Sequence, residues 1–418
     1  MRHRVFFILP FFVFLFSCDS NEEVIPEKEI TPEKEVIPET KPTVFTPTKW
    51  TKGTGTIEDP YQIEIPEHLF YLSKIVNEAV PKTPESEVFL NKNFKIMNDL
   101  DLNNVLFAPI GKNRELPFFG NLDGNFKKIS NLKIKTTNDP AGLFGNLQAS
   151  IKNLSIINGS IEGTNFVGGF AGEATVRIEN CSFEGTITGK NYIGGIVGYG
   201  AVTITNCSFN GNIQGEGEIG GIIGSIYGTT SQIKKCFNKG TIKGISTVGG
   251  IVGYKSDCAI EECYNIGNIT ASAQIAGGII GWSTGGSNLN IPNYTSNCYN
   301  KGKILAQKYS AGIIGSQDSG QVYNCYNTGE ISKLSEEYSN PIAKGYDYEF
   351  NLVDNCYYLN SSIILDPKIV LIRGISKDQN YMSTVSFVND LNKNNLPKAW
   401  KQDKTPNIND GYPILSWQ

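Results

Sequence analysis

Carboxylates are the first side chains to consider for chemistry, since two of them flanking a glycosidic bond can hydrolyse it. Glu216 and Glu218 form the best pair, although a solvated turn is the simpler interpretation. Glu261 and Glu262 are adjacent, so alternation along a strand predicts that their side chains point apart. The remaining acidic residues of the repetitive region do not recur at one spacing, which argues against paired-carboxylate catalysis. They include Glu162, Glu173, Glu184, Asp257, Asp318 and Glu330.

The composition disfavours two further classes of function. The 418 residues include two histidines, His3 and His68, so a Ser–His or Cys–His nucleophile is excluded from the rest of the chain. The formal net charge is −4 and no basic stripe exists to neutralise phosphates, which argues against nucleic acid. We expect no enzyme activity, no cofactor and no bound metal.

Nine cysteines raise the possibility of disulfides in an exported protein. Most of them recur once per repeat as Cys-x-x-x-Gly, at one strand position, so we interpret them as inward-facing free thiols. Bridges between adjacent repeats are the alternative, but stacked inward geometry rarely suits a disulfide. Cys258 breaks the period, and no Cys-x-x-Cys pair suggests zinc. The periodic cysteines are Cys181, Cys207, Cys236, Cys263, Cys298 and Cys325, with a terminal variant at Cys356.

An aromatic series one position after these cysteines is the candidate ligand-binding site. If each cysteine points inward, its neighbour points outward, which predicts a stripe of rings about 4.8 Å apart. Such a stripe could stack on sugar rings or receive a protein partner. Alternatively, the rings stack on one another to stabilise the sheet, or lie beneath a loop. The stripe consists of Phe237, Tyr264, Tyr299, Tyr326 and Tyr357. The asparagines that follow, Asn238, Asn265, Asn300 and Asn327, predict a hydrogen-bonded ladder at a turn.

The elements that position these residues are repeats. A Gly–apolar–apolar–Gly signature begins at Gly142, Gly169, Gly195, Gly221, Gly250, Gly278 and Gly312. Each unit carries short alternating strands separated by Asn and Gly corners. Such units bury an apolar face only by stacking. We therefore predict an all-β fold, a right-handed parallel β-helix with three short strands per coil of about 27 residues.

The signature, followed by an Asn-Cys-Tyr-Asn-x-Gly strand, closely resembles the GLUG-motif repeat of bacterial surface proteins. The leader Gly53–Tyr61 and the ending Asn409–Leu415 resemble the entry and exit segments of such proteins. The resemblance covers roughly residues 50–418, and the longer spacing before Gly312 suggests a loop insertion around residues 284–296. It implies adhesion or surface binding.

The N-terminus predicts export and a lipid anchor. A basic head precedes an apolar run from Val5 to Phe16, which is too short to span a bilayer and is typical of a signal peptide. Leu15-Phe-Ser-Cys18 resembles the lipobox of bacterial lipoproteins, with Cys18 as the lipid-attachment residue; an ordinary secretory signal is the alternative. The acidic tract after Cys18 resembles the surface-export signal of Bacteroidetes lipoproteins, although linker charge would look the same.

The whole chain divides into five segments. Helical spacing predicts short capping helices over Glu67–Val80 and Ser383–Asn392. The segments are a signal peptide (1–17), a lipidated, acidic and Pro-rich tether (18–48), an N-terminal cap with the first coils (49–140), the GLUG-type repeats (141–360) and a C-terminal cap (361–418). We expect an outer-membrane, surface-exposed adhesin or module that binds a glycan or a host or surface protein. A polysaccharide-processing lyase or glycosidase is the alternative.

Overall fold

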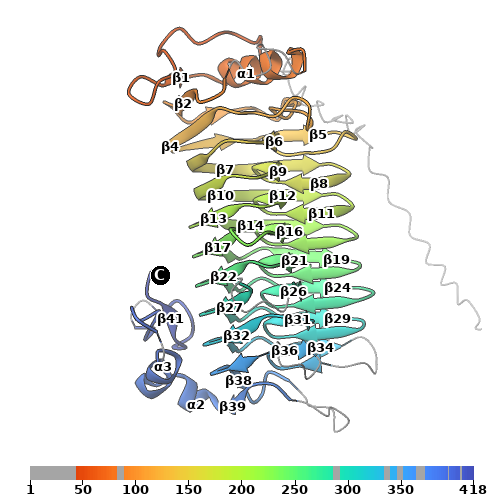
Figure 1. Ribbon diagram of the computed structural model, residues 1–418, viewed down its shortest axis with the longest axis vertical. Helices are drawn as coiled ribbons and strands as arrows, with labels where there is room; N and C mark the ends of the chain where they lie inside the picture. Colours follow the sequence, from red (N-terminus) through yellow and green to blue (C-terminus); the bar gives the residue numbers. More distant parts are fainter. Residues whose placement is uncertain are drawn as a thin grey trace, which may run out of the picture. The chain divides into compact units, whose positions relative to one another are not determined.

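The computed structural model describes residues 44–81, 89–285, 292–333, 339–345, 352–363, 372–393, 395–404 and 407–418. Within them the chain winds into a long solenoid of stacked parallel strands (Figure 1). The predicted parallel β-helix is therefore confirmed. The signal peptide, Cys18 and most of the tether lie outside the described residues. No helix among the described residues is long and apolar enough to cross a membrane.

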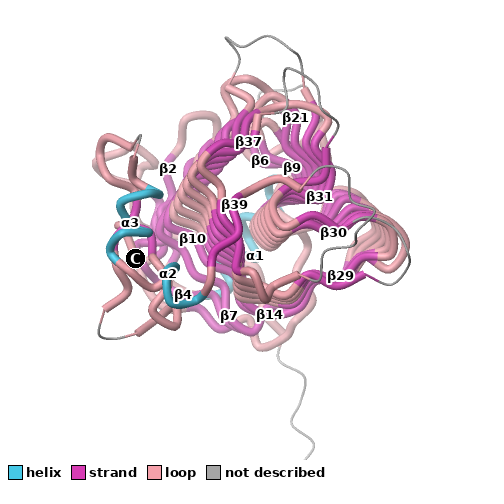
Figure 2. The backbone as a smooth tube through the Cα atoms, turned by 90° about the horizontal axis from the view of Figure 1, so that it is seen from below, coloured by secondary structure: helices cyan, strands magenta, loops and turns pink. Residues whose placement is uncertain are grey.

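Three sheets form the solenoid, and Figure 2 shows them along its axis. The second sheet contains β8 (Asn165–Gly168), β11 (Asn191–Gly194), β15 (Glu218–Gly220), β20 (Thr247–Gly249), β25 (Ile275–Gly277), β30 (Tyr309–Ala311) and β35 (Ser339–Asn340). The third sheet contains β6 (Phe144–Leu147), β9 (Ala171–Ala174), β12 (Val197–Gly200), β16 (Ile223–Tyr227), β21 (Val252–Ser256), β26 (Ile280–Thr284), β31 (Ile314–Gln317) and β36 (Ala343–Gly345).

The first sheet is the largest and changes along the solenoid. It begins with β1 (Tyr61–Ile63), β2 (Asn93–Ile96), β3 (Leu100–Asp101), β4 (Asn121–Ser130), β5 (Lys133–Lys135), β7 (Ile151–Glu162), β10 (Arg177–Thr188), β13 (Thr203–Thr205) and β14 (Ser208–Gln214). Triplets of short strands follow: β17 (Gln232–Lys234), β18 (Phe237–Asn238), β19 (Thr241–Gly244); β22 (Ala259–Glu261), β23 (Tyr264–Asn265), β24 (Ile269–Ala271); β27 (Tyr294–Ser296), β28 (Tyr299–Asn300), β29 (Ile304–Ala306); β32 (Gln321–Tyr323), β33 (Tyr326–Asn327), β34 (Ile331–Lys333). The sheet ends with β37 (Val353–Asp354), β38 (Tyr357–Leu359) and β39 (Ile375–Lys377).

The prediction of three strands per coil therefore holds only where the first-sheet strand is continuous, as in β10. From β17 on, the first-sheet strand is divided into three short strands, so each of these coils has five. The first division lies at a corner, also present within the continuous β10, whose residue directly precedes the periodic cysteine. This residue has a positive φ, a conformation that asparagine tolerates better than most residues. The corner residues are Asn180, Asn206, Lys235, Glu262, Asn297, Asn324 and Asn355, with φ between 48° and 55°.

The first glycine of each signature is required by the approach of the next coil. A Cβ on Gly250 would lie 2.0 Å from the carbonyl oxygen of Gly278 and 2.6 Å from Cγ of Asn265. The equivalent position on Gly195 would lie 2.1 Å from the oxygen of Gly221. These distances are far below van der Waals contact, so a larger residue would force adjacent coils apart.

The predicted asparagine ladder is confirmed, and it fills the space that these glycines leave. Asn238, Asn265, Asn300 and Asn327 are completely buried. Each of the first three donates from Nδ2 to Oδ1 of the next across 2.7 Å. Each of the four also donates to the carbonyl oxygen of the residue two positions on, across 2.9–3.0 Å. The ladder therefore satisfies its own buried polar groups while holding a turn.

Replacing Asn300 with Ala removes an acceptor from Asn265 and a donor from Asn327. We expect the free energy of unfolding to fall by about 3 kcal/mol, since each buried polar group left unpaired costs about 1–3 kcal/mol. Chemical denaturation measures this loss. The control is Asn268→Ala at an exposed position, with an expected loss below about 1 kcal/mol. Equal effects of the two substitutions would contradict a structural role for the ladder.

Helices lie at the N-terminal end and along one side. α1 (Pro66–Glu78) buries Leu69, Leu72 and Val76 and covers the first coils, close to the predicted position of a cap (Figure 1). α2 (Gln379–Met382) and α3 (Val385–Leu391) are followed by the antiparallel pair β40 (Trp400–Lys401) and β41 (Ile414–Leu415). The second predicted helix is thus confirmed by α3. Its predicted role is wrong, because α3 and the β40–β41 pair lie beside the first sheet.

Candidate functional site

The predicted aromatic stripe forms, but the C-terminal segment covers it. Successive rings from Phe237 to Tyr326 are stacked at centroid distances of 4.9, 5.0 and 5.2 Å, with interplanar angles of 3°. Tyr264, Tyr299, Tyr326 and Tyr357 are only 7%, 2%, 0% and 6% exposed. The stripe is therefore not an open ligand platform.

The cover is an apolar interface with specific hydrogen bonds. Trp400 lies 5.3 Å from the ring of Tyr326, and Trp417 lies 5.9 Å from that of Tyr264. The Tyr326 hydroxyl donates to the carbonyl oxygen of Pro413 and accepts from Asn409 Nδ2 at 2.7 Å. The interpretation of the stripe as a binding site is therefore wrong. Alternation along the strand correctly places the rings on the outer face of the sheet, but it carries no information about a distant segment that packs over them. The alternative, rings stacked beneath a covering segment, holds.

We therefore expect the Tyr299→Ala substitution to lower the stability of the fold. Removing a buried aromatic side chain costs about 3–5 kcal/mol, so the denaturation midpoint should fall steeply. A matched control is Tyr254→Ala on the third sheet, where the side chain is half-buried and the expected cost is about 1 kcal/mol. If Tyr299→Ala left stability unchanged, the covering segment would not be packed on the stripe.

All eight cysteines within the described residues are free and buried, which confirms the thiol interpretation. Each periodic thiol donates to the carbonyl oxygen two residues earlier, as Cys236 does to Lys234 at 3.3 Å. Cys258 is off the ladder and is also completely buried. Burial raises the pKa of the Cys258 thiol to about 11, so little of it is ionised to the thiolate at neutral pH.

A water-soluble disulfide reagent should label almost no thiol in a folded fragment spanning residues 44–418. The same fragment should expose all eight thiols after denaturation without reductant. Spectrophotometric titration of the released chromophore gives both numbers. Fewer than eight thiols in the denatured sample would mean that bridges exist and that the free-thiol assignment fails.

Three acidic residues, Glu261, Glu262 and Glu218, have surroundings that differ from those predicted. Glu261 and Glu262 do not diverge, because the positive φ of Glu262 breaks the alternation. Their carboxylates lie 2.7 and 3.4 Å from Lys234 Nζ. Glu218 is half-buried on β15, and burial raises the pKa of its carboxyl group, so it is more than a solvated turn residue. Among the described residues, no group of three or more His, Cys, Asp or Glu is placed to hold a metal ion.

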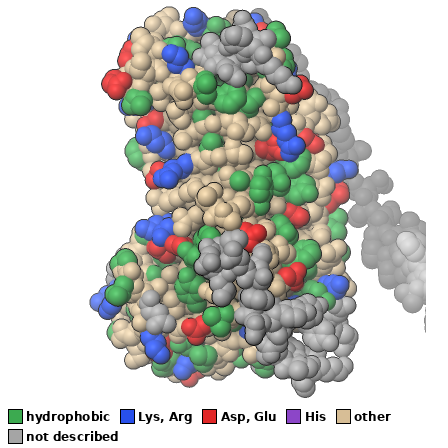
Figure 3. Space-filling model, in the orientation of Figure 1, with side chains coloured by type: hydrophobic (Ala, Val, Ile, Leu, Met, Phe, Trp, Pro, Cys, Tyr) green, Lys and Arg blue, Asp and Glu red, His purple; other side chains and the backbone are tan. Residues whose placement is uncertain are grey.

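Sequence reasoning missed an aromatic cluster on the second and third sheets. Tyr199 on β12 contacts Tyr227 at 5.1 Å and meets the rings of Phe166 and Tyr192 at 5.4 and 5.5 Å, edge to face. Phe166 and Tyr192 stack on each other at 4.9 Å. All four rings remain at least partly exposed. The third-sheet face carries a gathering of hydrophobic side chains with cationic and acidic side chains nearby (Figure 3).

Two members of this cluster have an unusual backbone. Phe166 has a φ of 51° and Tyr192 a φ of 58°, the left-handed region that bulky residues rarely occupy. Such a conformation costs of order 1–3 kcal/mol and persists only when its surroundings enforce it. Here it presents two stacked rings beside Tyr199, which marks this part of the surface as a candidate for function.

A polar group adjoins the rings. Arg114 Nε donates to both carboxylate oxygens of Glu173 at 3.0 and 2.9 Å, and its guanidinium carbon lies 5.5 Å from the centre of the Phe166 ring. Asn146 Nδ2 donates to the same carboxylate at 2.9 Å, and Gln148 donates to Asn146 at 2.9 Å. The Glu173 side chain is 7% exposed and that of Arg114 is 67% exposed.

These side chains line a cavity of about 420 Å³, which we call the Tyr199 site. Arg114, Asn146, Gln148, Glu173, Tyr199 and Tyr227 form it. A sequence signal existed, because Glu173 and Tyr199 each directly follow a Gly–apolar–apolar–Gly signature. The same position holds Tyr254 and Trp282 in later coils. Parallel pairing places these positions in one column of the third sheet.

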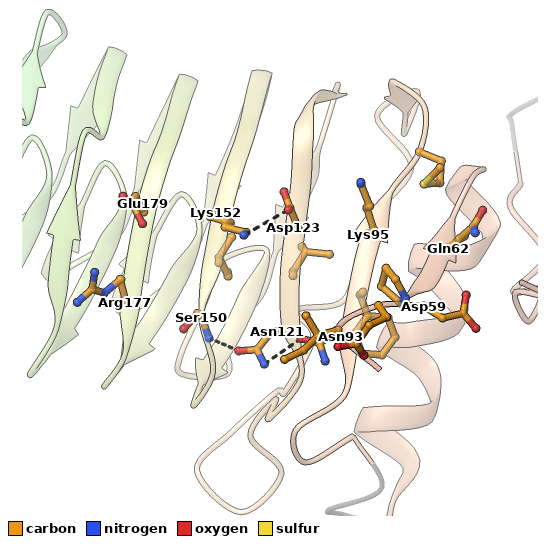
Figure 4. A pocket seen from close by; sticks show the side chains of 17 residues that line it. Asp59, Gln62, Asn93, Lys95, Asn121, Asp123, Ser150, Lys152, Arg177 and Glu179 are labelled. Atoms are coloured by element: carbon orange, nitrogen blue, oxygen red, sulfur yellow. Dashed lines mark hydrogen bonds and ion pairs between the residues drawn. The ribbon is translucent and has the colours of Figure 1, made fainter. Parts of the chain in front are cut away.

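A larger groove of about 620 Å³ lies on the first sheet near the N-terminal end (Figure 4). Several of its polar side chains engage one another: Asn121 donates to Asn93 at 3.3 Å, and Lys152 lies 3.5 Å from Asp123. The aromatic ring among its lining residues, that of Phe94, is only 1% exposed. The Tyr199 site is therefore the stronger candidate for binding through ring faces.

Comparison with known proteins agrees with the repeat. Residues 163–188 match the model of the GLUG motif. Halomucin from Haloquadratum walsbyi is 32% identical over 133 residues, which are 31% of this chain and 1% of halomucin. The chain thus spans a very small part of that relative's length.

Two solved structures are similar at 20% identity. A candidate immunoglobulin A1 protease from Bacteroides ovatus has a TM-score of 0.46, with 88% of this chain and 96% of that chain covered. An IgA1 protease has a TM-score of 0.49, with 76% of this chain and 23% of that chain covered. The matched GLUG motif spans the signature that begins at Gly169, one of seven such signatures in the chain, and the stacked coils that carry them form a parallel β-helix.

Proposed function

We propose that this protein is a non-catalytic binding module of the cell surface, and that the Tyr199 site holds a glycan. The observation that carries the proposal is the combination of partly exposed tyrosine rings with planar polar side chains around one cavity. Sugar rings have apolar C–H faces that pack on aromatic rings, while their hydroxyls bond to amide, guanidinium and carboxylate groups.

The charge of the site favours a neutral glycan. Glu173 is the nearly buried acid of the site, and the Arg114 guanidinium pairs with it through both carboxylate oxygens. The pairing leaves little net charge to attract an anionic or cationic ligand. It also fixes the direction of the Glu173 oxygens, so the site is ordered before a ligand arrives.

The remaining assignments rest on the sequence. We propose that Cys18 is lipidated and that the Pro-rich tether holds the body away from the outer membrane, exposed at the surface. The GLUG repeat, which resembles repeats of bacterial surface proteins, supports this location. The lack of histidine after residue 68 supports binding without catalysis. A protein partner is the second ligand class, since Tyr and Arg dominate many protein interfaces.

A glycan array probed with residues 44–418 tests the proposal. We expect saturable binding to a neutral glycan, with Tyr199→Ala and Arg114→Ala each weakening it about 10-fold or more, which corresponds to about 1.4 kcal/mol. Tyr254→Ala, in the same column two coils away, is the matched control and should bind like the unaltered fragment.

Two outcomes would count against the proposal. Undiminished binding by both the Tyr199 and Arg114 variants would place the ligand elsewhere. A blank glycan array together with binding to a surface protein that the Arg114 variant loses would identify the site as a protein interface.

A further inference from the structure

Lys255 is a buried amine that the proposed binding function does not use. It lies on β21, where its backbone pairs with Ile226 in the preceding coil and Ser283 in the next. The side chain points into the solenoid and is only 1% exposed. Burying a charged ammonium group is costly, so this position requires an explanation.

The amine is held against a side-chain amide. Lys255 Nζ lies 2.9 Å from Oδ1 of Asn293, and its other contacts are the carbonyl oxygens of Cys258 at 3.0 Å and Tyr294 at 3.3 Å. Burial lowers the pKa of Lys255 to about 8. A substantial fraction of the amine is therefore neutral, and hence nucleophilic, at slightly alkaline pH.

The amide is fixed and shielded from water. Asn293 is 8% exposed, and its Nδ2 donates to the Thr284 carbonyl oxygen and to Ser319 Oγ, both at 3.1 Å. These two bonds turn its carbonyl group toward the lysine. The reacting groups are therefore held together, which is the condition under which intramolecular acyl transfer becomes fast.

A carboxylate lies near the amide, and its charge also acts on the Lys255 amine. The position that a Cβ on Gly285 would take is 2.4 Å from Asp257 Oδ1 and 2.6 Å from Asn293 Nδ2, so the acid and the amide are neighbours. Ser256 Oγ bonds to the other oxygen of Asp257 at 3.1 Å. Asp257 is therefore the carboxylate that we assign to proton transfer in the reaction proposed below.

We propose that Lys255 and Asn293 form an intramolecular isopeptide bond. The lone pair of neutral Nζ attacks Cγ of Asn293, and a new C–N bond forms. The bond from Cγ to Nδ2 breaks, Asp257 transfers the proton lost by Nζ to the departing nitrogen, and ammonia leaves. No oxidant or cofactor is needed, since a primary amide is exchanged for a secondary amide.

The bond would connect two coils at the predicted insertion. Lys255 lies on β21, one coil before the insertion expected around residues 284–296, and Asn293 lies near the end of that insertion. A covalent link there closes a loop of the chain and lowers the entropy of the unfolded state. It would also stop the solenoid from being peeled apart at this point, which suits a protein pulled on by a bound partner.

Mass spectrometry of the purified full chain tests the proposal. After tryptic digestion we expect one branched peptide that joins the Lys255 and Asn293 segments and lacks the mass of one ammonia. Asn293→Ala should remove the branched peptide, and Asp257→Ala should leave most of the chain unlinked. Asn293→Asp should restore the same branched product by loss of water. Recovery of only linear peptides from the unaltered chain would overturn the proposal and leave Lys255 as a buried cation held by carbonyl oxygens.

Discussion

The contact between the first glycines of successive signatures is the constraint on which the structure depends. A carbonyl oxygen of one coil occupies the place where the preceding glycine would carry its Cβ, as at Gly250 and Gly278. The contact sets a close, constant separation and brings equivalent residues of each coil into register. Ladders follow from that register, because any residue type that returns once per repeat must stack on its copies.

Each ladder stabilises the solenoid through a different kind of interaction. Inward positions hold apolar side chains and thiols, and the asparagine ladder satisfies buried turns. The outward aromatic stripe of the first sheet would be a long apolar surface in water, and the C-terminal segment removes it from solvent through Trp400 and Trp417. The third sheet interrupts its aromatic column with Ser225, and its rings stay partly exposed near the Arg114–Glu173 pair. Regular stripes here serve stability, and the irregular cluster is the candidate for binding.

Much of the fold could be predicted because residues that recur once per repeat determine how the coils stack. The glycine signatures, the cysteine spacing and the asparagines after each aromatic residue all carry a local signal that the structure confirms. The segment after residue 378 has no period, and its packing on Tyr264 and Tyr326 depends on contacts between residues far apart in the sequence. Alternation also fails at Glu262, where a corner residue with positive φ turns the side chain.

The Tyr199 site was missed for a related reason. Arg114 and Glu173 come from separate coils, and no spacing in the sequence links them. Of the two aromatic clusters, the one at the Tyr199 site is accessible and the stripe on the first sheet is covered. Hydroxyl-radical footprinting with peptide mass spectrometry tests it most directly by comparing oxidation rates of individual tyrosines in the folded fragment. We predict rapid oxidation of Tyr227 and Tyr199 and protection of Tyr299 and Tyr326; rapid oxidation of the latter pair with protection of the former would contradict the account.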